Sequence, residues 1–308
     1  MVLGKHVNQG WAELDGNGHY WPAQPPAIPP SYYAMPDDPL VSPNYEGWWA
    51  RAGALAKKIW KPALKLNAVA LLPLLALTVP ANVILTIEQR ELQAATLDQT
   101  DPPGLSALSG FMTAIGWVLA ATLVAALVSA VITSATVRLV VLAATGQPVS
   151  LREALRTALR RGPAVIGWQI LGGFLGVLAL LACFLPILYV GAALMILPVV
   201  VTIERGVGIG RSFSLFHADI GASLARIGSI WAVTIGASMV LAAIGAALEL
   251  TIGGTPGAVV SSLWSGLYYL VAGIYITPLL VTAYADMRAR REPFSTAYLT
   301  PQAEHPAA

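Results

Sequence analysis

The stretch "IERGVGIGRSFSLF", residues 203–216, joins alternating glycines to an Arg-Ser pair, as a phosphate-binding loop would. A Walker loop needs G-x-x-x-x-G-K-[ST], but Arg205 stands in place of its first glycine and Arg211 in place of its lysine. A dinucleotide loop, G-x-G-x-x-G, would need its third glycine where Arg211 stands. The glycines therefore predict a flexible exit from a membrane helix into a surface helix over 209–220, and no nucleotide site.

Charged side chains gather in this stretch and in "YADMRARRE", residues 284–292. One interpretation is a docking site for proteins or anionic lipids, since each basic residue near an anionic leaflet contributes about 1 kcal/mol. The other is topology anchoring together with local salt bridges, for example between Glu204 and Arg211 or among Asp286, its neighbouring arginines and Glu292. The residues expected to make docking or anionic-lipid contacts are Arg152, Arg156, Arg160, Glu204, Arg211, Asp286, Arg288 and Arg290.

Catalytic and metal-binding patterns are missing from the sequence. It contains neither H-E-x-x-H nor G-x-S-x-G, and no apolar span carries paired carboxylates. Cys183 is the single cysteine, and the four histidines lie in different segments without metal-ligand spacing. We therefore expect a protein without catalytic activity, cofactor or metal, and without nucleic acid as a partner.

The composition is that of an integral membrane protein. Hydrophobic residues make up 56% of the chain and charged residues 11%, whereas soluble domains are about a quarter charged. Residues 1–46 are rich in Pro, Gly, Tyr and Asp and lack an apolar core segment, so they predict a disordered cytoplasmic tail and no signal peptide. Residues 47–292 form the expected membrane domain, and 293–308 a short cytoplasmic tail.

Hydropathy divides the membrane domain into six spans of the length that a bilayer requires, about 17 to 25 residues or somewhat more when tilted. The uncharged run from Pro163 to Ile203 is too long for one crossing, and "FLPI" at 184–187 is its predicted turn. The expected spans are 66–87, 111–137, 163–184, 187–203, 227–250 and 259–281.

The distribution of charge predicts the orientation of these spans. Every Lys and Arg except Arg90 falls on the side that carries the N-terminus. Because cytoplasmic loops are enriched in these residues, both termini are expected in the cytoplasm.

The six spans pair into three hairpins, each preceded by a basic segment. In "SLREALRTALRR", residues 150–161, Ser150 and Glu153 form a capping box. Leucines and alanines line one face and Arg152, Arg156 and Arg160 the next, which predicts a helix lying in the membrane interface. A similar segment before the first span is interrupted by Pro62. "PVVVT" at 198–202 and "PLLVT" at 278–282 recur at equivalent places and indicate an internal repeat.

Polar residues and prolines in the spans raise the alternative of transport. Asn82, Gln169 and Glu249 are the polar groups within or near the spans, and intramembrane polar groups often mark function. Prolines can break helices around a transport site, but proline is common in membrane helices, and simple kinks are the favoured explanation. The prolines in question are Pro73, Pro80, Pro198 and Pro278.

"LPVVVTIERGVGIGRSFSLF", "YADMRARREPF" and "GQPVSLREAL" together resemble bacterial six-span proteins related to the membrane domain of some glycerophosphodiester phosphodiesterases. The resemblance covers about residues 50–299. It implies a six-helix membrane domain with inside termini in the bacterial inner membrane. No stretch is long enough for the catalytic domain, so phosphodiesterase activity is not expected. Arg205 stands where the family usually has the glycine of Glu-Gly.

Three hypotheses follow for the function. The first is a non-catalytic scaffold or assembly partner that docks proteins or anionic lipids at the cytoplasmic face, with a protein partner or a second copy of the chain. The alternative is a transporter or permease component for a lipid or small solute. The third is an intramembrane enzyme acting on lipid. The shortage of polar residues in the middle of the spans favours the first.

Overall fold

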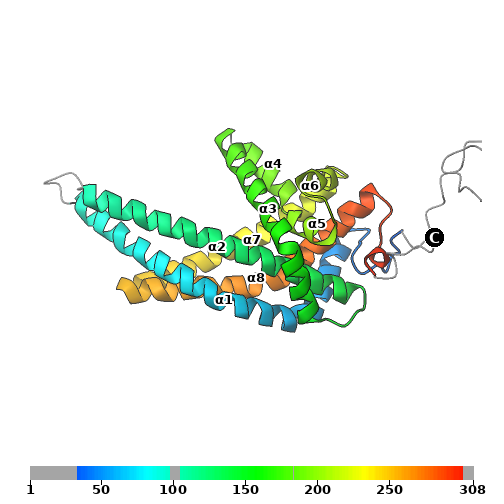
Figure 1. Ribbon diagram of the computed structural model, residues 1–308, viewed down its shortest axis with the longest axis horizontal. Helices are drawn as coiled ribbons and strands as arrows, with labels where there is room; N and C mark the ends of the chain where they lie inside the picture. Colours follow the sequence, from blue (N-terminus) through cyan, green and yellow to red (C-terminus); the bar gives the residue numbers. More distant parts are fainter. Residues whose placement is uncertain (1–32, 98–104, 183, 301–308) are drawn as a thin grey trace, which may run out of the picture.

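The computed structural model describes residues 33–97, 105–182 and 184–300, and in these ranges every regular element is a helix (Figure 1). The elements are α1 (Tyr45–Leu97), α2 (Leu105–Ala144), α3 (Leu151–Ala182), α4 (Phe184–Leu194), α5 (Leu197–Ile203), α6 (Ile209–Phe216), α7 (Ile220–Ile252), α8 (Gly254–Arg291) and the short 3₁₀ helix η2 (Thr296–Leu299).

Six helical stretches of the described chain are long and apolar enough to cross a membrane. They are α1, α2 from Leu108 onward, α3, α4 from Leu185 together with α5, α7 and α8. Helices suit this environment because each satisfies its own backbone hydrogen bonds without water. The prediction of an all-helical chain with six helices long and apolar enough to cross a membrane is thus confirmed for the described residues.

The first helix is longer than the expected span at both ends. α1 has 53 residues, which at 1.5 Å per residue is about 80 Å, against about 30 Å for the apolar core of a bilayer. It contains Pro62, Pro73 and Pro80 without a break. The expected interruption at Pro62 is therefore wrong. A proline removes only one hydrogen bond, and residues on both sides of Pro62, including Ile59 and Leu66, are held in the core.

The segment expected as a separate interfacial helix is instead the beginning of α3. The helix starts directly after Ser150, whose hydroxyl accepts a hydrogen bond from the Glu153 N–H, and runs unbroken to Ala182. Ala154, Ala158 and Gly162 recur at a spacing of four and are buried where α3 packs against α2. This packing extends the helix across the predicted boundary at residue 162.

The fourth span consists of two pieces. α4 begins at Phe184, so the expected turn at 184–187 is already helix, and residue 183 before it lies outside the described ranges. α4 ends at Leu194 and α5 begins at Leu197, with Pro198 in its first turn. Proline has no N–H to donate to the preceding turn, which explains why the helix restarts here.

Two glycines of the 206–210 run have distinct structural reasons. Gly206 has φ +72°, a backbone conformation that other residues rarely adopt. A Cβ on Gly208 would lie 2.2 Å from the Trp168 ring, so only glycine fits there. The expected exit from the fourth span is therefore present, although the following helix α6 ends at Phe216. Residues 217–219 lie between α6 and α7, and Asp219 caps the beginning of α7.

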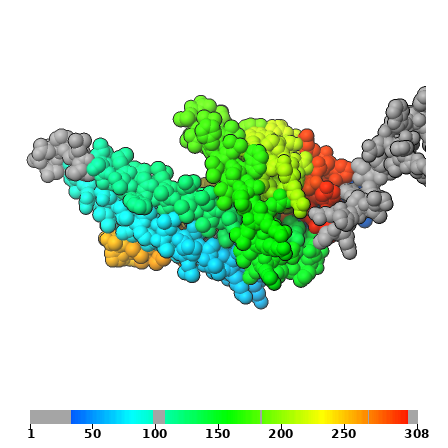
Figure 2. Space-filling view, in the orientation of Figure 1, coloured from blue at the N-terminus to red at the C-terminus, as the bar shows by residue number. Residues whose placement is uncertain are grey.

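Buried side chains gather where the ends of α2, α5 and α8 meet, and we call this the core end of the bundle. From it α1 and α2 run away together, α7 and α8 follow a similar direction, and α3 with α4 projects separately (Figure 1). The separation of the α3–α4 pair, in green, is also visible on the surface (Figure 2). Phe174, Leu181 and Leu185 on this pair are 61%, 77% and 71% exposed, as expected for lipid-facing residues.

The two copies of the Pro-x-x-x-Thr motif share one structural detail. The Thr202 hydroxyl donates to the Pro198 carbonyl at 2.6 Å, and the Thr282 hydroxyl donates to the Pro278 carbonyl at 2.9 Å. Both motifs lie in the core end, in helices of two different spans. The same hydrogen bond to the carbonyl four residues earlier also forms at Thr136 and Thr234, so it is not particular to the two motifs, and the internal repeat stays a prediction.

Part of the predicted N-terminal tail is packed against the core end. Leu40 is 1% exposed, and Asp38 accepts hydrogen bonds from the backbone N–H groups of Leu40 and Val41. The Asp38 carboxylate also binds Thr296, through the backbone N–H at 2.8 Å and through the hydroxyl. Residues 33–44 therefore differ from the expected disorder, because this carboxylate ties them to the C-terminal segment. Residues 1–32 lie outside the described ranges.

Candidate functional site

The core end carries the charged residues that the sequence analysis singled out. They come from the first turns of α3, the loop between α5 and α6, α6 itself and the last turns of α8. Within the described chain they form two internal ion-pair clusters and one exposed arginine face.

The first ion-pair cluster, which we call the Glu204 cluster, joins Glu204, Arg211, Tyr284, Arg288 and Glu292. Arg211 binds Glu204 through Nε at 2.8 Å and Glu292 through Nη2 at 2.7 Å. The Tyr284 hydroxyl donates to Glu204 Oε1 at 2.8 Å and accepts from Arg288 Nη1 at 2.9 Å. Arg288 also pairs with Glu292 one turn later, which closes the ring of contacts.

Alternating charges favour the ionised forms of Arg211 and Glu292 in the Glu204 cluster. Burial lowers the pKa of Arg211, but its hydrogen bonds to Glu292 and Glu204 outweigh this and leave the pKa above its usual value. Burial likewise raises the pKa of Glu292, and hydrogen bonds from Arg211 and Arg288 more than offset that rise. The pKa of Glu292 therefore lies below its usual value.

Aromatic rings cover one side of the Glu204 cluster. The guanidinium carbon of Arg288 lies 4.5 Å from the centroid of the Phe294 ring and 4.8 Å from that of Tyr298. A planar guanidinium stacks well on such rings and gains a cation–π attraction, which is larger where water is excluded. The segment after α8 is thereby held against the end of that helix.

The second ion-pair cluster, the Asp286 cluster, joins α7 to α8. Arg226 Nη2 lies 2.6 Å from Asp286 Oδ2, and Arg290 Nε lies 3.3 Å from the same oxygen. Arg290 reaches Asp219, the N-cap residue of α7, at 2.6 Å. The backbone N–H of Ala222 and then the charge of Arg290 lower the pKa of Asp219, although burial opposes them.

Five of the eight residues expected to make docking contacts thus have partners within the protein. These are Glu204, Arg211, Asp286, Arg288 and Arg290. The local salt bridges of the second interpretation are present in both clusters. The sequence reasoning missed Tyr284, Asp219 and Arg226, all of which take part. Only Tyr284 had a sequence signal, its spacing of four residues from Arg288 on a helix.

The other three expected residues, Arg152, Arg156 and Arg160, form an exposed face on the first turns of α3. None of them has an ion pair with any residue that the structure describes. Beside them, Leu155 and Leu159 are 40% and 70% exposed. The apolar face predicted for this segment is therefore divided, since its alanines pack against α2 while these two leucines point away from the protein.

A second exposed basic face lies on α1. Its members are Lys57, Lys58, Lys61 and Lys65. Trp60 is exposed among them, with the Lys61 Nζ 5.5 Å from the centroid of its ring. Basic side chains next to an exposed tryptophan are typical of the boundary between lipid and water.

The polar groups of the spans do not converge on one place. Asn82 is exposed and Gln169 is partly exposed. Glu249, near the end of α7, lies 3.5 Å from Arg90 of α1 and accepts a hydrogen bond from Ser261. The Arg90–Glu249 pair connects α1 and α7 away from the core end.

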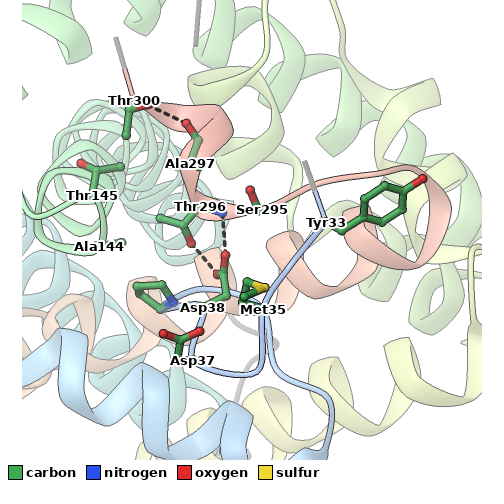
Figure 3. A pocket seen from close by; sticks show the side chains of 11 residues that line it. Tyr33, Met35, Asp37, Asp38, Ala144, Thr145, Ser295, Thr296, Ala297 and Thr300 are labelled. Carbon is green, nitrogen blue, oxygen red and sulfur yellow. Dashed lines mark hydrogen bonds between the residues drawn. The ribbon is translucent and has the colours of Figure 1, made fainter. Parts of the chain in front are cut away.

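A cavity of about 520 Å³ lies between the N-terminal segment, the end of α2 and the segment after α8 (Figure 3). Thr296 donates its two hydrogen bonds to the Asp38 carboxylate in the lining of this cavity (Figure 3). Its lining consists of Tyr33, Met35, Asp37, Asp38, Pro39, Ala144, Thr145, Ser295, Thr296, Ala297 and Thr300. Among the described residues no group of three or more His, Cys, Asp or Glu could hold a metal ion.

Comparisons with other proteins add no further residue to this site. No family model, no curated protein and no solved structure matches the chain. The candidate site therefore rests on its own geometry, which consists of two internal ion-pair clusters and two exposed basic faces.

Proposed function

We propose that the protein is a non-catalytic scaffold or assembly partner of the bacterial inner membrane, docking proteins or anionic lipids at its cytoplasmic face. Three hairpins with both termini in the cytoplasm would place the core end at that face, as the charge distribution of the sequence favours. The resemblance to phosphodiesterase membrane domains concerns this architecture and brings no catalytic role with it.

The observation that carries the proposal is the exposed face formed by Arg152, Arg156 and Arg160 beside Leu155 and Leu159. Three cations without an internal carboxylate partner in the described chain are available to an external anion. Each contributes about 1 kcal/mol near an anionic leaflet. Salt screens this attraction, which falls off within about 8 Å at physiological ionic strength. The leucines add apolar contact with the acyl region.

The ion-pair clusters support this role indirectly. They join α5, α6, α7, α8 and the C-terminal segment at the end where the arginine face lies. A docking face needs rigid support, since ordering a mobile surface on binding would consume part of the interaction energy.

Binding of labelled phosphatidylglycerol to the purified chain in neutral detergent tests the proposal, with phosphatidylcholine as the neutral comparison. The triple variant R152Q/R156Q/R160Q should bind phosphatidylglycerol at least about tenfold more weakly, from the loss of three charge contacts. The matched variant R152K/R156K/R160K keeps the charges and should retain most of the binding. Unchanged binding in the glutamine variant would remove the lipid-docking role.

Transport is the second candidate, and one observation favours it. The fourth span is in two pieces, and discontinuous helices often surround the substrate sites of transporters. The residues at its break, including Ala193, Ile196 and Leu197, are buried and apolar, which offers no polar group to a solute. Affinity purification from native membranes separates the candidates: a stoichiometric protein partner supports the scaffold, and a specific lipid alone supports lipid handling.

A further inference from the structure

One face of α3 changes from cationic to apolar along the helix. Its members follow one another at steps of three or four residues, so they lie above one another on the helix, and all of them are exposed. The first three are Arg152, Arg156 and Arg160. The apolar members that continue the face are Pro163, Gly167, Ile170, Phe174, Val177 and Leu181. We call this set the outer face of α3.

The opposite face of α3 is the one that packs within the protein. Ala154, Ala158 and Gly162 are buried on it, and the helix contacts α2, α4 and α5. α3, in green, accordingly lies at the surface in Figure 2. Glu153, the acidic residue in the first turn, pairs with Arg138 of α2 and so does not neutralise the arginines of the outer face.

The cationic part of the outer face lies at the right level for a lipid phosphate. Arg160 precedes Pro163, where the uncharged run begins, by about 4.5 Å of helix axis, and Arg156 lies about 6 Å further. The headgroup layer is roughly 5 to 8 Å thick, and arginine side chains are long enough to extend into it from either position. A guanidinium donates two parallel hydrogen bonds to two phosphate oxygens. Arg152 lies one turn further from the apolar run.

Small residues follow the arginines on the outer face. Pro163 and Gly167 are its members there, and a Cβ on Gly167 would meet nothing within 4 Å. An acyl chain can therefore approach the α3 backbone before it passes Ile170 and Phe174, which are 57% and 61% exposed. From Pro163 to Phe174 the helix axis is about 16 Å long, close to the roughly 15 Å of half the apolar core of a bilayer.

The basic face of α1 provides a comparison with a different boundary. Lys65 is followed on the same face by Val69 and Leu72, which are 73% and 72% exposed. These branched side chains keep an acyl chain away from the helix backbone directly after the last cation. A lysine ammonium also binds phosphate as a point charge and lacks the planar fork of arginine.

We propose that the outer face of α3 binds one anionic phospholipid, with its phosphate at Arg156 and Arg160 and one acyl chain along Gly167, Ile170 and Phe174. The charge of the headgroup complements the arginines, and the hydrocarbon chain complements the apolar members of the face. The inference rests on the proposed function and assigns to its lipid a defined position and orientation.

The test is photolabelling of the full chain in neutral detergent micelles. The probe is a phosphatidylglycerol with a photoreactive diazirine midway along one acyl chain, and mass spectrometry of peptides locates its adducts after illumination. Adducts should concentrate on residues 163–174 and exceed those on α1. Unlabelled phosphatidylglycerol should displace the probe, whereas phosphatidylcholine should not. Equal labelling of α1 and α3, or the same pattern from a phosphatidylcholine with the same diazirine, would overturn the assignment.

Arginine variants test the position of the phosphate. R156Q and R160Q should each lower the labelling of residues 163–174 by about threefold or more, since each removes one charge contact. R152Q should have the smallest effect of the three. R156K and R160K keep the charge and should restore part of the labelling. The α1 variant K57Q/K61Q/K65Q should keep it fully. A loss in R152Q as large as that in R160Q would contradict the assigned phosphate position.

A glycine variant tests the position of the acyl chain. G167L fills the place next to the backbone and should lower the labelling of residues 163–174 by about threefold or more. G236L fills an exposed position of α7 where a Cβ also meets nothing within 4 Å, and should leave the labelling unchanged. Leucine favours helix over glycine, so both variants should unfold at temperatures no lower than the wild type. Full labelling in G167L would refute the acyl position.

Two further outcomes separate this site from the proposed function. Binding of phosphatidylglycerol that is lost in R152Q/R156Q/R160Q but complete in G167L, with adducts spread over α1 and α3, would refute the site and leave lipid docking standing. Equal binding in R152Q/R156Q/R160Q and the wild type would refute both. Displacement of the probe by an equal concentration of inorganic phosphate would show that the acyl chain contributes nothing, which also overturns the assignment.

Discussion

Arg226 in the second turn of α7 and Asp286 near the end of α8 form an ion pair in which both side chains are only 3% exposed. Their Nη2 and Oδ2 atoms lie 2.6 Å apart, and a second guanidinium nitrogen of Arg226 donates to the Ala222 carbonyl at 3.1 Å. Removing two charges from water is costly, so this pair is stable only while both partners remain.

Breaking this pair from one side should destabilise the protein strongly. D286A leaves the Arg226 guanidinium buried without its carboxylate, and we expect the free energy of unfolding to fall by about 3 kcal/mol or more. Combining R226M with D286L removes both charges and should recover most of that loss. Denaturant unfolding in detergent, followed by tryptophan fluorescence, measures these differences.

The partly exposed arginine of the same cluster provides the comparison. R290Q removes contacts to Asp286 and Asp219 that solvent screens, and should cost no more than about 1 kcal/mol. If D286A were as mild as R290Q, the buried pair would not support the junction of α7 and α8.

The hydroxyl of Tyr284 should contribute measurably to the stability of the folded protein. It connects Glu204 to Arg288, and both of its hydrogen bonds involve a charged partner. Y284F should therefore lower the free energy of unfolding by about 1.5 kcal/mol or more. Y275F changes a tyrosine of the same helix that is 59% exposed and should have no measurable effect. Equal stability of the two variants would show that the Glu204 cluster does not need this link.

Acid should weaken the Glu204 cluster through Glu292. Burial opposes ionisation of this carboxyl, yet the hydrogen bonds from Arg211 and Arg288 outweigh it and lower its pKa in the folded protein. The stabilisation is complete above the ordinary glutamate pKa of about 4.3 and is lost as the pH falls through the lower folded value. Between about pH 5 and pH 3 the unfolding temperature of E292Q should fall less steeply than that of the wild type.

The control for this pH dependence is the exposed Glu46 at the beginning of α1. E46Q also removes one carboxyl group, but Glu46 has no ion pair among the described residues. The unfolding temperature of this variant should therefore fall with pH as steeply as that of the wild type. A slope for E292Q that matches the wild type would contradict the role assigned to Glu292.

Two glycines of the 206–210 run should respond oppositely to alanine. G208A places a Cβ 2.2 Å from the Trp168 ring and should destabilise the protein by about 1 to 3 kcal/mol. A Cβ on Gly210, inside α6, meets nothing within 4 Å, so G210A should be neutral or stabilise by up to about 1 kcal/mol. Unfolding temperatures of the two variants measured side by side decide this. Similar values would mean that the Trp168 contact yields easily.

The membrane architecture was predictable because its signals are local. A span is a run of apolar residues, and the cost of burying charge in lipid keeps Lys65 and Glu88 outside the first one. The boundary between span and flanking helix was not predictable in the same way. Packing of Ala154, Ala158 and Gly162 on α2 continues α3 through the segment that amphipathicity alone assigned to a separate helix.

The sequence by itself determined that this protein is helical, crosses a membrane and gathers its cations near the ends of the spans. Only the tertiary structure decided which of these cations pair with carboxylates of the protein and which can bind an external anion. Arg211, Arg226 and Arg288 find carboxylates within the protein, including Asp286, which is 60 residues from Arg226. Arg152, Arg156 and Arg160 find none among the described residues. The physical reason is that charge is a property of a residue, whereas the pairing of charges depends on distances that folding alone sets.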